Sequence, residues 1–231
     1  MRLHRSTTEA VIQALETIFG GNRYADKVLE KVLKQNSKWG ARDRGFIAET
    51  TYDIVRWYRL IKRITAAKGD DYWKLLAGWC ILHHVDLPAW HGFKGISLSK
   101  VLEEKQKAEN IRKVRESIPD WLDEMGETEL GNRWERELHA LNNEANVVLR
   151  VNTLKISKDD LQRRLAEENV ETHANTEFPD ALVLAERQNV FITDSFKEGL
   201  FEVQDAASQY IAPFLRVEPG MRVIDACAGA G

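Results

Sequence analysis

Cysteines and long apolar runs are scarce in this chain of 231 residues, and both shortages exclude whole classes of protein. Cys80 and Cys227 are too few and too far apart for a disulfide framework, which favours a reducing compartment. No apolar run approaches the roughly 18 residues of a membrane span. Residues 1–6 lack the apolar core of a signal peptide. We therefore expect a cytoplasmic protein with no membrane partner.

Patterns that bind metals are also missing. No cysteines and histidines are spaced as in a zinc site. His83 and His84 form the only histidine pair, and adjacent residues on a helix point in different directions. No metal site is predicted. Cys80 lies among apolar residues and is interpreted as a small packing residue.

Charge is unevenly distributed along the chain. The overall composition, 43% apolar and 30% charged, is ordinary for a soluble globular protein. The length suggests two domains. The net charge is −3, yet residues 1–68 hold 14 lysines and arginines against seven acids, and the remainder is acidic. A basic first third indicates an end that faces a polyanion, and solvated helix faces are the alternative.

Residues 1–143 carry apolar side chains at helical spacing, which predicts an all-helical domain. A capping box at Ser6–Glu9 is expected to begin the first helix, and Gly20 and Gly21 to end it. A long helix is expected from Asp43 to about Arg63. Further helices are expected after Asp70 or Asp71, over roughly Ser99 to Glu116, after Pro119, and through Trp134 to Leu141.

The pattern changes after Asn143, where β-branched residues at 147–151 predict a strand. A helix capped near Ser157 should follow. Further strands are predicted at 170–172, 181–184 and 200–204, with 190–192 as a candidate to pair beside them. Helical segments are expected at 193–198 and 206–215, the second capped by Asp205. Residues 144–216 are therefore predicted to form a small α/β domain.

The last stretch, residues 217–231, is interpreted as the opening of a further domain. Val223 and Ile224 predict a short buried strand that leads into a loop of small residues. Small residues after a strand let the backbone approach a ligand closely, and a following helix N-terminus would favour an anionic group. A plain tight turn is the alternative. The loop consists of Cys227, Ala228, Gly229, Ala230 and Gly231.

Three motifs in this order carry a family resemblance: residues 150–152 (Arg-Val-Asn), residues 201–208 (Phe-Glu-Val-Gln-Asp-Ala-Ala-Ser) and the glycine/alanine loop after Val223. The chain resembles the N-terminal part of the Sun/NOL1/NOP2 family of RNA cytosine-C5 methyltransferases, in its RsmB- or Fmu-like branch. The resemblance implies an all-α NusB-like domain over 1–143 and an RRM- or ferredoxin-like α/β domain over 144–216. It also implies the start of a truncated Rossmann-like methyltransferase domain over 217–231.

The resemblance implies S-adenosylmethionine as the cofactor of the parent protein, with residues 227–231 as part of its binding loop. The family's loop often reads Cys-Ala-Ala-Pro-Gly-Gly-Lys, so Gly229 and Ala230 depart from it while staying small. In the family a cysteine attacks C6 of cytosine, and no catalytic residue can be assigned to this chain. The chain by itself is therefore expected to lack methyl transfer and to bind the cofactor weakly or not at all.

The partner implied by the resemblance is RNA, in particular ribosomal RNA. Arg150 and Asn152 are the first candidates, because they supply donors for phosphates and base edges, and a pairing of Arg150 with Asp205 is the alternative. A second candidate surface is basic and includes Arg42, Arg44 and Arg56. The competing functions are a NusB-like RNA- or protein-binding module without catalysis, and the start of a different Rossmann enzyme. The oligomeric state stays open, with a monomer favoured.

Overall fold

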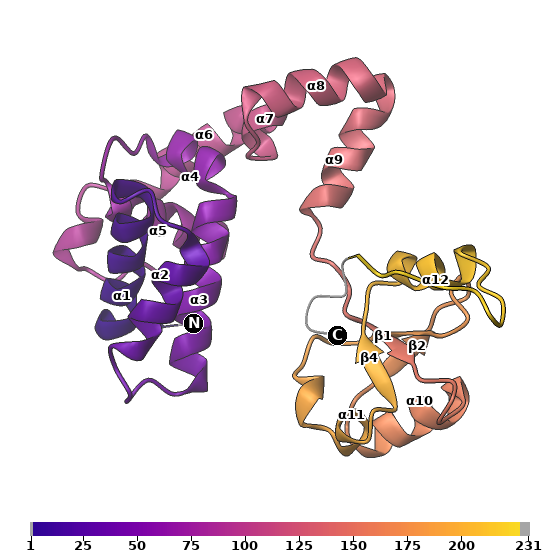
Figure 1. Ribbon diagram of the computed structural model, residues 1–231. Helices are drawn as coiled ribbons and strands as arrows, with labels where there is room; N and C mark the ends of the chain where they lie inside the picture. Colours follow the sequence, from indigo (N-terminus) through magenta and orange to yellow (C-terminus); the bar gives the residue numbers. More distant parts are fainter. Residues whose placement is uncertain (1, 227–231) are drawn as a thin grey trace. The chain divides into compact units, whose positions relative to one another are not determined.

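The computed structural model describes residues 2–226, and the chain divides into two compact units between Asn143 and Glu144 (Figure 1). The first unit contains only helices among its described residues, and the second contains a small sheet. Within residues 2–226, every helix is too short or too polar to cross a bilayer. We refer to the two parts as the helical unit and the sheet unit.

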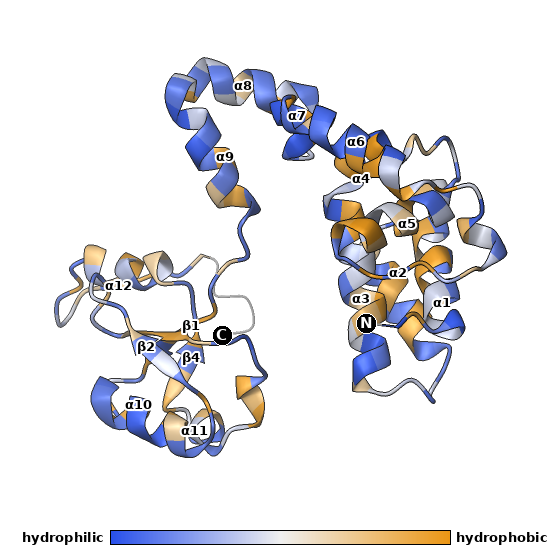
Figure 2. Ribbon diagram, turned by 180° about the vertical axis from the view of Figure 1, so that it is seen from behind, coloured by the Kyte–Doolittle hydropathy of each residue, from blue (hydrophilic) through white to orange (hydrophobic). Residues whose placement is uncertain are grey.

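The helical unit begins with five helices that share one core: α1 (Arg5–Leu15, extended by a π-helical turn to Gly20), α2 (Ala25–Lys34), α3 (Ala41–Arg56), α4 (Tyr58–Thr65) and α5 (Tyr72–Leu82). Each contributes apolar side chains at helical spacing, so one face of each helix is removed from water. Figure 2 colours the hydrophobic stretches of these helices orange, and their buried side chains form one core. Fully buried members of this core include Leu15, Ile47, Ile54, Ile61 and Leu76.

Four more helices complete the helical unit: α6 (Leu98–Glu109), α7 (Arg112–Arg115), α8 (Asp120–Leu130) and α9 (Trp134–Asn142). They bury much less apolar surface than the first five. α6 and α7 pack against α4 and α5 through a small cluster that includes Val101 and Val114. α8 and α9 pack on each other around Trp134 and Leu138.

The sheet unit has four antiparallel strands in the order β2-β3-β1-β4. Its elements are β1 (Val148–Val151), α10 (Lys158–Glu167), β2 (Thr172–Ala174), β3 (Ala181–Leu184), α11 (Asp194–Lys197), β4 (Phe201–Val203) and α12 (Ile211–Phe214). A β-α-β-β-α-β order with the first strand in the middle is the ferredoxin-like arrangement. This confirms the predicted small ferredoxin-like α/β domain.

The two faces of this sheet differ in chemistry. Leu149 and Val151 of β1 point into a core with Phe201 and with Leu161 and Leu165 of α10. Because side chains alternate along a strand, Arg150 lies on the opposite face, where Glu202 is its neighbour on β4. Figure 1 shows α10 and α11 on one side of the sheet and α12 toward the other.

Several predicted helix boundaries in the helical unit are wrong. α1 begins at Arg5 with His4 as its N-cap, so the Ser6–Glu9 capping box is not formed. Asp43 is the third residue of α3, and its carboxylate accepts a hydrogen bond from the Gly40 N–H at 3.3 Å. The expected helix from 43 to 63 is interrupted at Trp57. The N–H of Arg59 donates to Ser117 Oγ (3.1 Å), a partner 58 residues away.

Two predicted strands are also corrected. Residues Val190–Ile192 form a 3-10 turn, because the Asn189 side chain accepts a hydrogen bond from the Phe191 N–H (3.1 Å) and Val190 is buried in the core. Val223 and Ile224 form no strand, and Ile224 is 91% exposed. A strand needs a paired neighbour for its backbone groups, and the described residues supply none here. The predicted cofactor loop at 227–231 lies outside the described residues.

Candidate functional site

The residues expected to bind RNA are distributed over α3 and β1, and the structure gives them different surroundings. Arg42 lies in the first turn of α3, and its exposed side chain forms no hydrogen bond or ion pair with any residue in the described range 2–226. It borders a cavity of about 500 Å³ between residues 2–7, α3 and the end of α5. We call this the α3–α5 cavity. It brings Arg42 together with Arg2, a second arginine without a bonded partner within that range.

Asp53 on α3 organises the polar part of the α3–α5 cavity. Its Oδ2 accepts a hydrogen bond from Trp79 Nε1 (3.1 Å) and lies 3.4 Å from His83 Nε2. The rings of Trp79 and His83 are stacked with their centroids 4.5 Å apart. None of these three residues was predicted from the sequence as part of a binding site. The four-residue spacing of Trp79 and His83, which places them on one helix face, was the available signal.

Arg44 and Arg56 of the same helix have intramolecular partners. Arg44 donates from its Nη1 to the carbonyl oxygen of Leu33 at 2.9 Å, which links the end of α2 to α3. Arg56 lies over the Trp57 ring and donates to the carbonyl oxygens of Ser117 (3.3 Å) and Glu116 (3.4 Å). Desolvation by burial lowers the pKa of Arg56, against the opposing effect of Glu116. Both side chains therefore have structural roles, and their contact with RNA stays a prediction.

Arg150 and Asn152 also differ: the Arg150 side chain is free, and the Asn152 side chain is hydrogen-bonded. The Arg150 side chain is exposed and forms no hydrogen bond or ion pair within the described part of the chain. The alternative pairing with Asp205 is not formed, because Asp205 Oδ2 accepts from the N–H groups of Ala207 (3.0 Å) and Ser208 (3.4 Å) as the predicted cap.

The Asn152 amide is used inside the sheet unit. Its Nδ2 donates to the carbonyl oxygen of Gly199 at 2.9 Å, and its backbone N–H donates to that of Leu200 at 2.8 Å. Both bonds tie the end of β1 to the segment that leads into β4. An Asn152 amide held in this way supports the strand pair, while Arg150 beside it stays available to a ligand.

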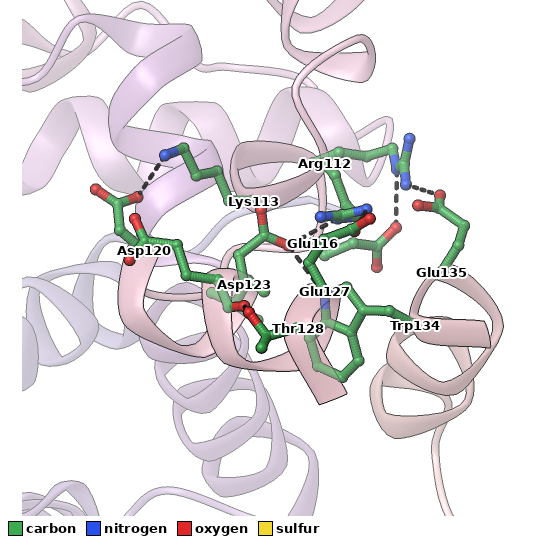
Figure 3. A network of polar contacts seen from close by, with 12 residues as sticks. Arg112, Lys113, Glu116, Asp120, Asp123, Glu127, Thr128, Trp134 and Glu135 are labelled. Carbon is green, nitrogen blue, oxygen red and sulfur yellow. Dashed lines mark hydrogen bonds and ion pairs between the residues drawn. The ribbon is translucent and has the colours of Figure 1, made fainter. Parts of the chain in front are cut away.

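The cations of α7 pair with Glu116, which directly follows α7, and with acids of α8 and α9 (Figure 3). Asp123 Oδ1 accepts from Arg112 Nε (2.7 Å) and from Trp134 Nε1 (3.0 Å), and Arg112 also pairs with Glu127 (2.7 Å). The hydrogen bond from Arg112 lowers the pKa of Asp123. Lys113 pairs with Asp120, and Arg115 with Glu116 and Glu135. Because these positive charges are paired with acids within the chain, α7 has less unpaired positive charge available to bind a polyanion than Arg42 or Arg150 has.

A nucleophile is not evident in the described residues. Cys80 is buried, and burial raises the pKa of its thiol to about 12, so the reactive thiolate is scarce at neutral pH. Within residues 2–226, no three side chains of His, Cys, Asp or Glu are grouped as metal ligands would be.

The chain is similar to known proteins in sequence and in fold. Residues 118–191 match the family model of the Methyltr_RsmF/B-like, ferredoxin-like domain. The chain is 27% identical to the probable ribosomal RNA small subunit methyltransferase B of Synechocystis sp., over 98% of this chain and 59% of that protein. It is 29% identical to the ribosomal RNA small subunit methyltransferase B of Pseudomonas putida, over 96% of this chain and 57% of that protein.

The crystal structure of PH0851 has the same fold over 95% of this chain and 57% of that one, with a TM-score of 0.61 and 19% identity. The chain therefore has a helical region followed by a ferredoxin-like domain, and part of it matches the model of the RsmF/B-like, ferredoxin-like domain. The matches confirm that the chain resembles the N-terminal part of the Sun/NOL1/NOP2 family, in its RsmB-like branch. The chain spans less than two thirds of the length of these curated relatives.

Proposed function

We propose that this chain is the RNA-binding and positioning region of an S-adenosylmethionine-dependent ribosomal RNA cytosine-C5 methyltransferase. The observation that carries the proposal is the family match at residues 118–191, together with relatives named as ribosomal RNA methyltransferases that align with nearly the whole chain. The helical unit is proposed to be NusB-like. The methyl donor and the cytosine specificity come from the family resemblance.

Residues 217–231 are proposed to open the methyltransferase domain, with the 227–231 loop contributing to the cofactor site. S-adenosylmethionine would supply the methyl group there. Support comes from the apolar side chains that residues 211–226 expose, since large exposed apolar surface usually marks a contact with another protein part. They include Ile211, Phe214, Leu215, Val223 and Ile224.

The RNA is proposed to contact the free arginines Arg42 and Arg150. Guanidinium groups without intramolecular partners can bind phosphates without breaking an existing ion pair. Methyl transfer is assigned to residues that this chain does not contribute, because Cys80 is buried with a raised pKa. The 231-residue chain alone is therefore expected to bind RNA and to leave it unmethylated.

A salt titration tests the RNA-binding proposal. Labelled single-stranded ribosomal RNA fragments are titrated with the chain at several salt concentrations, and each lost phosphate contact should reduce the log–log slope by about 0.7 to 0.9. Arg42→Ala and Arg150→Ala are expected to weaken binding and reduce the slope. Arg136→Ala is the control, because the exposed Arg136 guanidinium already pairs with Glu137 (2.7 Å). An absence of RNA binding at low salt would contradict the proposal.

The methyltransferase part is tested separately. The gene sequence after the codon for Gly231 is expected to continue the loop with glycine and lysine and to encode two later cysteines in the family's contexts. A reading frame that encodes a dehydrogenase site, or none, would favour the competing functions. Methyl transfer by the 231-residue chain itself would contradict the division between binding and catalysis.

A further inference from the structure

We propose that the α3–α5 cavity holds one unpaired RNA nucleotide, with its base inside and its phosphate at the mouth. This inference rests on the proposed RNA-binding function and names the place where a base is recognised. The cavity volume of about 500 Å³ lies in the range of small-molecule sites, roughly 300 to 1,000 Å³. Phe46 and Trp79 line it and pack edge to face, with ring centroids 6.1 Å apart.

Asp53 provides the acceptor that would read the base. Trp79 Nε1 and His83 both lie against its Oδ2, which orients the carboxylate. No residue in the described range donates a hydrogen bond to Oδ1. Carboxylates accept hydrogen bonds from base amino groups, such as N4 of cytosine. A free Oδ1 in this cavity therefore favours cytosine, adenine or guanine over uracil, which has no amino group.

The charges at the mouth determine where the phosphate lies. Arg2 and Arg42 are exposed and unpaired within residues 2–226, so both can contact it. Asp43 also lines the cavity, and its carboxylate accepts a hydrogen bond from the Gly40 N–H (3.3 Å). Glu49 is exposed on the same cavity, and its charge opposes a phosphate. The site therefore predicts opposite effects for loss of Arg42 and loss of the Glu49 charge.

Binding of labelled single-stranded oligonucleotides of cytidine, adenosine or uridine by the full 231-residue chain tests the proposal by fluorescence anisotropy. The unmodified chain is expected to bind the cytidine and adenosine oligomers more tightly than the uridine oligomer. Asp53→Asn should weaken the first two about tenfold and remove most of the preference. Arg42→Ala should weaken all three alike, and Glu49→Gln should strengthen all three. Asp26→Asn, an exposed carboxylate on α2, is the control.

Phe46→Leu covers the possibility that Asp53→Asn disturbs folding through Trp79. It removes the aromatic ring that lines the cavity beside Trp79 and keeps an apolar side chain, so the affinity for all three oligonucleotides should fall several-fold. If the chain binds RNA and both Asp53→Asn and Phe46→Leu leave affinity and base preference unchanged, the cavity proposal is overturned and the proposed function stands. If the chain binds no RNA, both proposals fail.

Discussion

Gly126 of α8 lies against the indole of Trp134 so closely that a Cβ at this position would come within 3.0 Å of three of its ring carbons. Trp134 is 3% exposed and donates from its Nε1 to Asp123. The ring therefore has little freedom to move. The packing of α8 on α9 depends on the absence of a side chain at residue 126.

We expect Gly126→Ala to destabilise the helical unit by about 1–3 kcal/mol through overpacking. Urea unfolding followed by the fluorescence of the tryptophans measures the change. Gly45→Ala on α3 is the matched control, because its Cβ would meet only the Glu49 carboxylate at 3.6 Å. That replacement should be neutral or stabilising by up to about 1 kcal/mol, since alanine favours a helix. Equal effects of the two substitutions would contradict the packing argument.

Asp123 is expected to make the stability of α7–α9 depend on pH. The hydrogen bond from Arg112 lowers its pKa in the folded state below the unfolded value of about 3.9. A lowered folded pKa contributes stability above the unfolded pKa, and this contribution is lost as the pH falls through the folded pKa. Asp123→Asn should therefore reduce the free energy of unfolding by about 1–3 kcal/mol at pH 7, with a smaller difference below pH ~4.

Urea unfolding between pH 7 and pH 3 measures this dependence. Asp86→Asn serves as the control, because Asp86 is exposed and has no ion pair within residues 2–226. A difference between Asp123→Asn and the unmodified chain that stays constant with pH would show that the carboxylate charge is not responsible.

Neighbouring substitutions on β1 should separate stability from binding. Asn152→Ala removes the bond to the Gly199 carbonyl oxygen and should destabilise the sheet unit by about 1 kcal/mol. Arg150→Ala should change stability by less than about 0.5 kcal/mol, because its side chain forms no bond within residues 2–226. Thermal unfolding and RNA titration of both variants measure the two effects. The reverse result, with Arg150→Ala unstable and Asn152→Ala deficient only in binding, would contradict the assignment.

Cys80 should be chemically silent in the folded protein. Its side chain is inaccessible, and burial raises its pKa to about 12. In a Cys227→Ser background, a thiol reagent such as Ellman's reagent should detect no thiol in the native chain and one after unfolding in urea. Fast reaction of the native chain at pH 8 would show that the α5 core opens readily.

The sequence predicted those elements whose causes are local. Strand 181–184 and the Asp205 cap were both confirmed, because β-branched content and a capping side chain act within a few residues. Periodic apolar residues predicted most helices for the same reason. The motifs at 150–152 and 201–208 led to the family resemblance that the comparisons confirm. The loop at 227–231 remains a prediction.

Tertiary structure decided the other features, because the residues that form each of these contacts come from distant parts of the chain. The helix is interrupted at Trp57, and nearby the Arg59 N–H donates a hydrogen bond to Ser117 Oγ. The Asp53–Trp79 pair exists only because α3 and α5 pack side by side. Local sequence determined which segments form helices and strands and which residues carry charge. Only long-range packing decided that Arg44 and Arg56 are bonded internally while Arg42 and Arg150 stay free, since a guanidinium finds its acceptors across the fold.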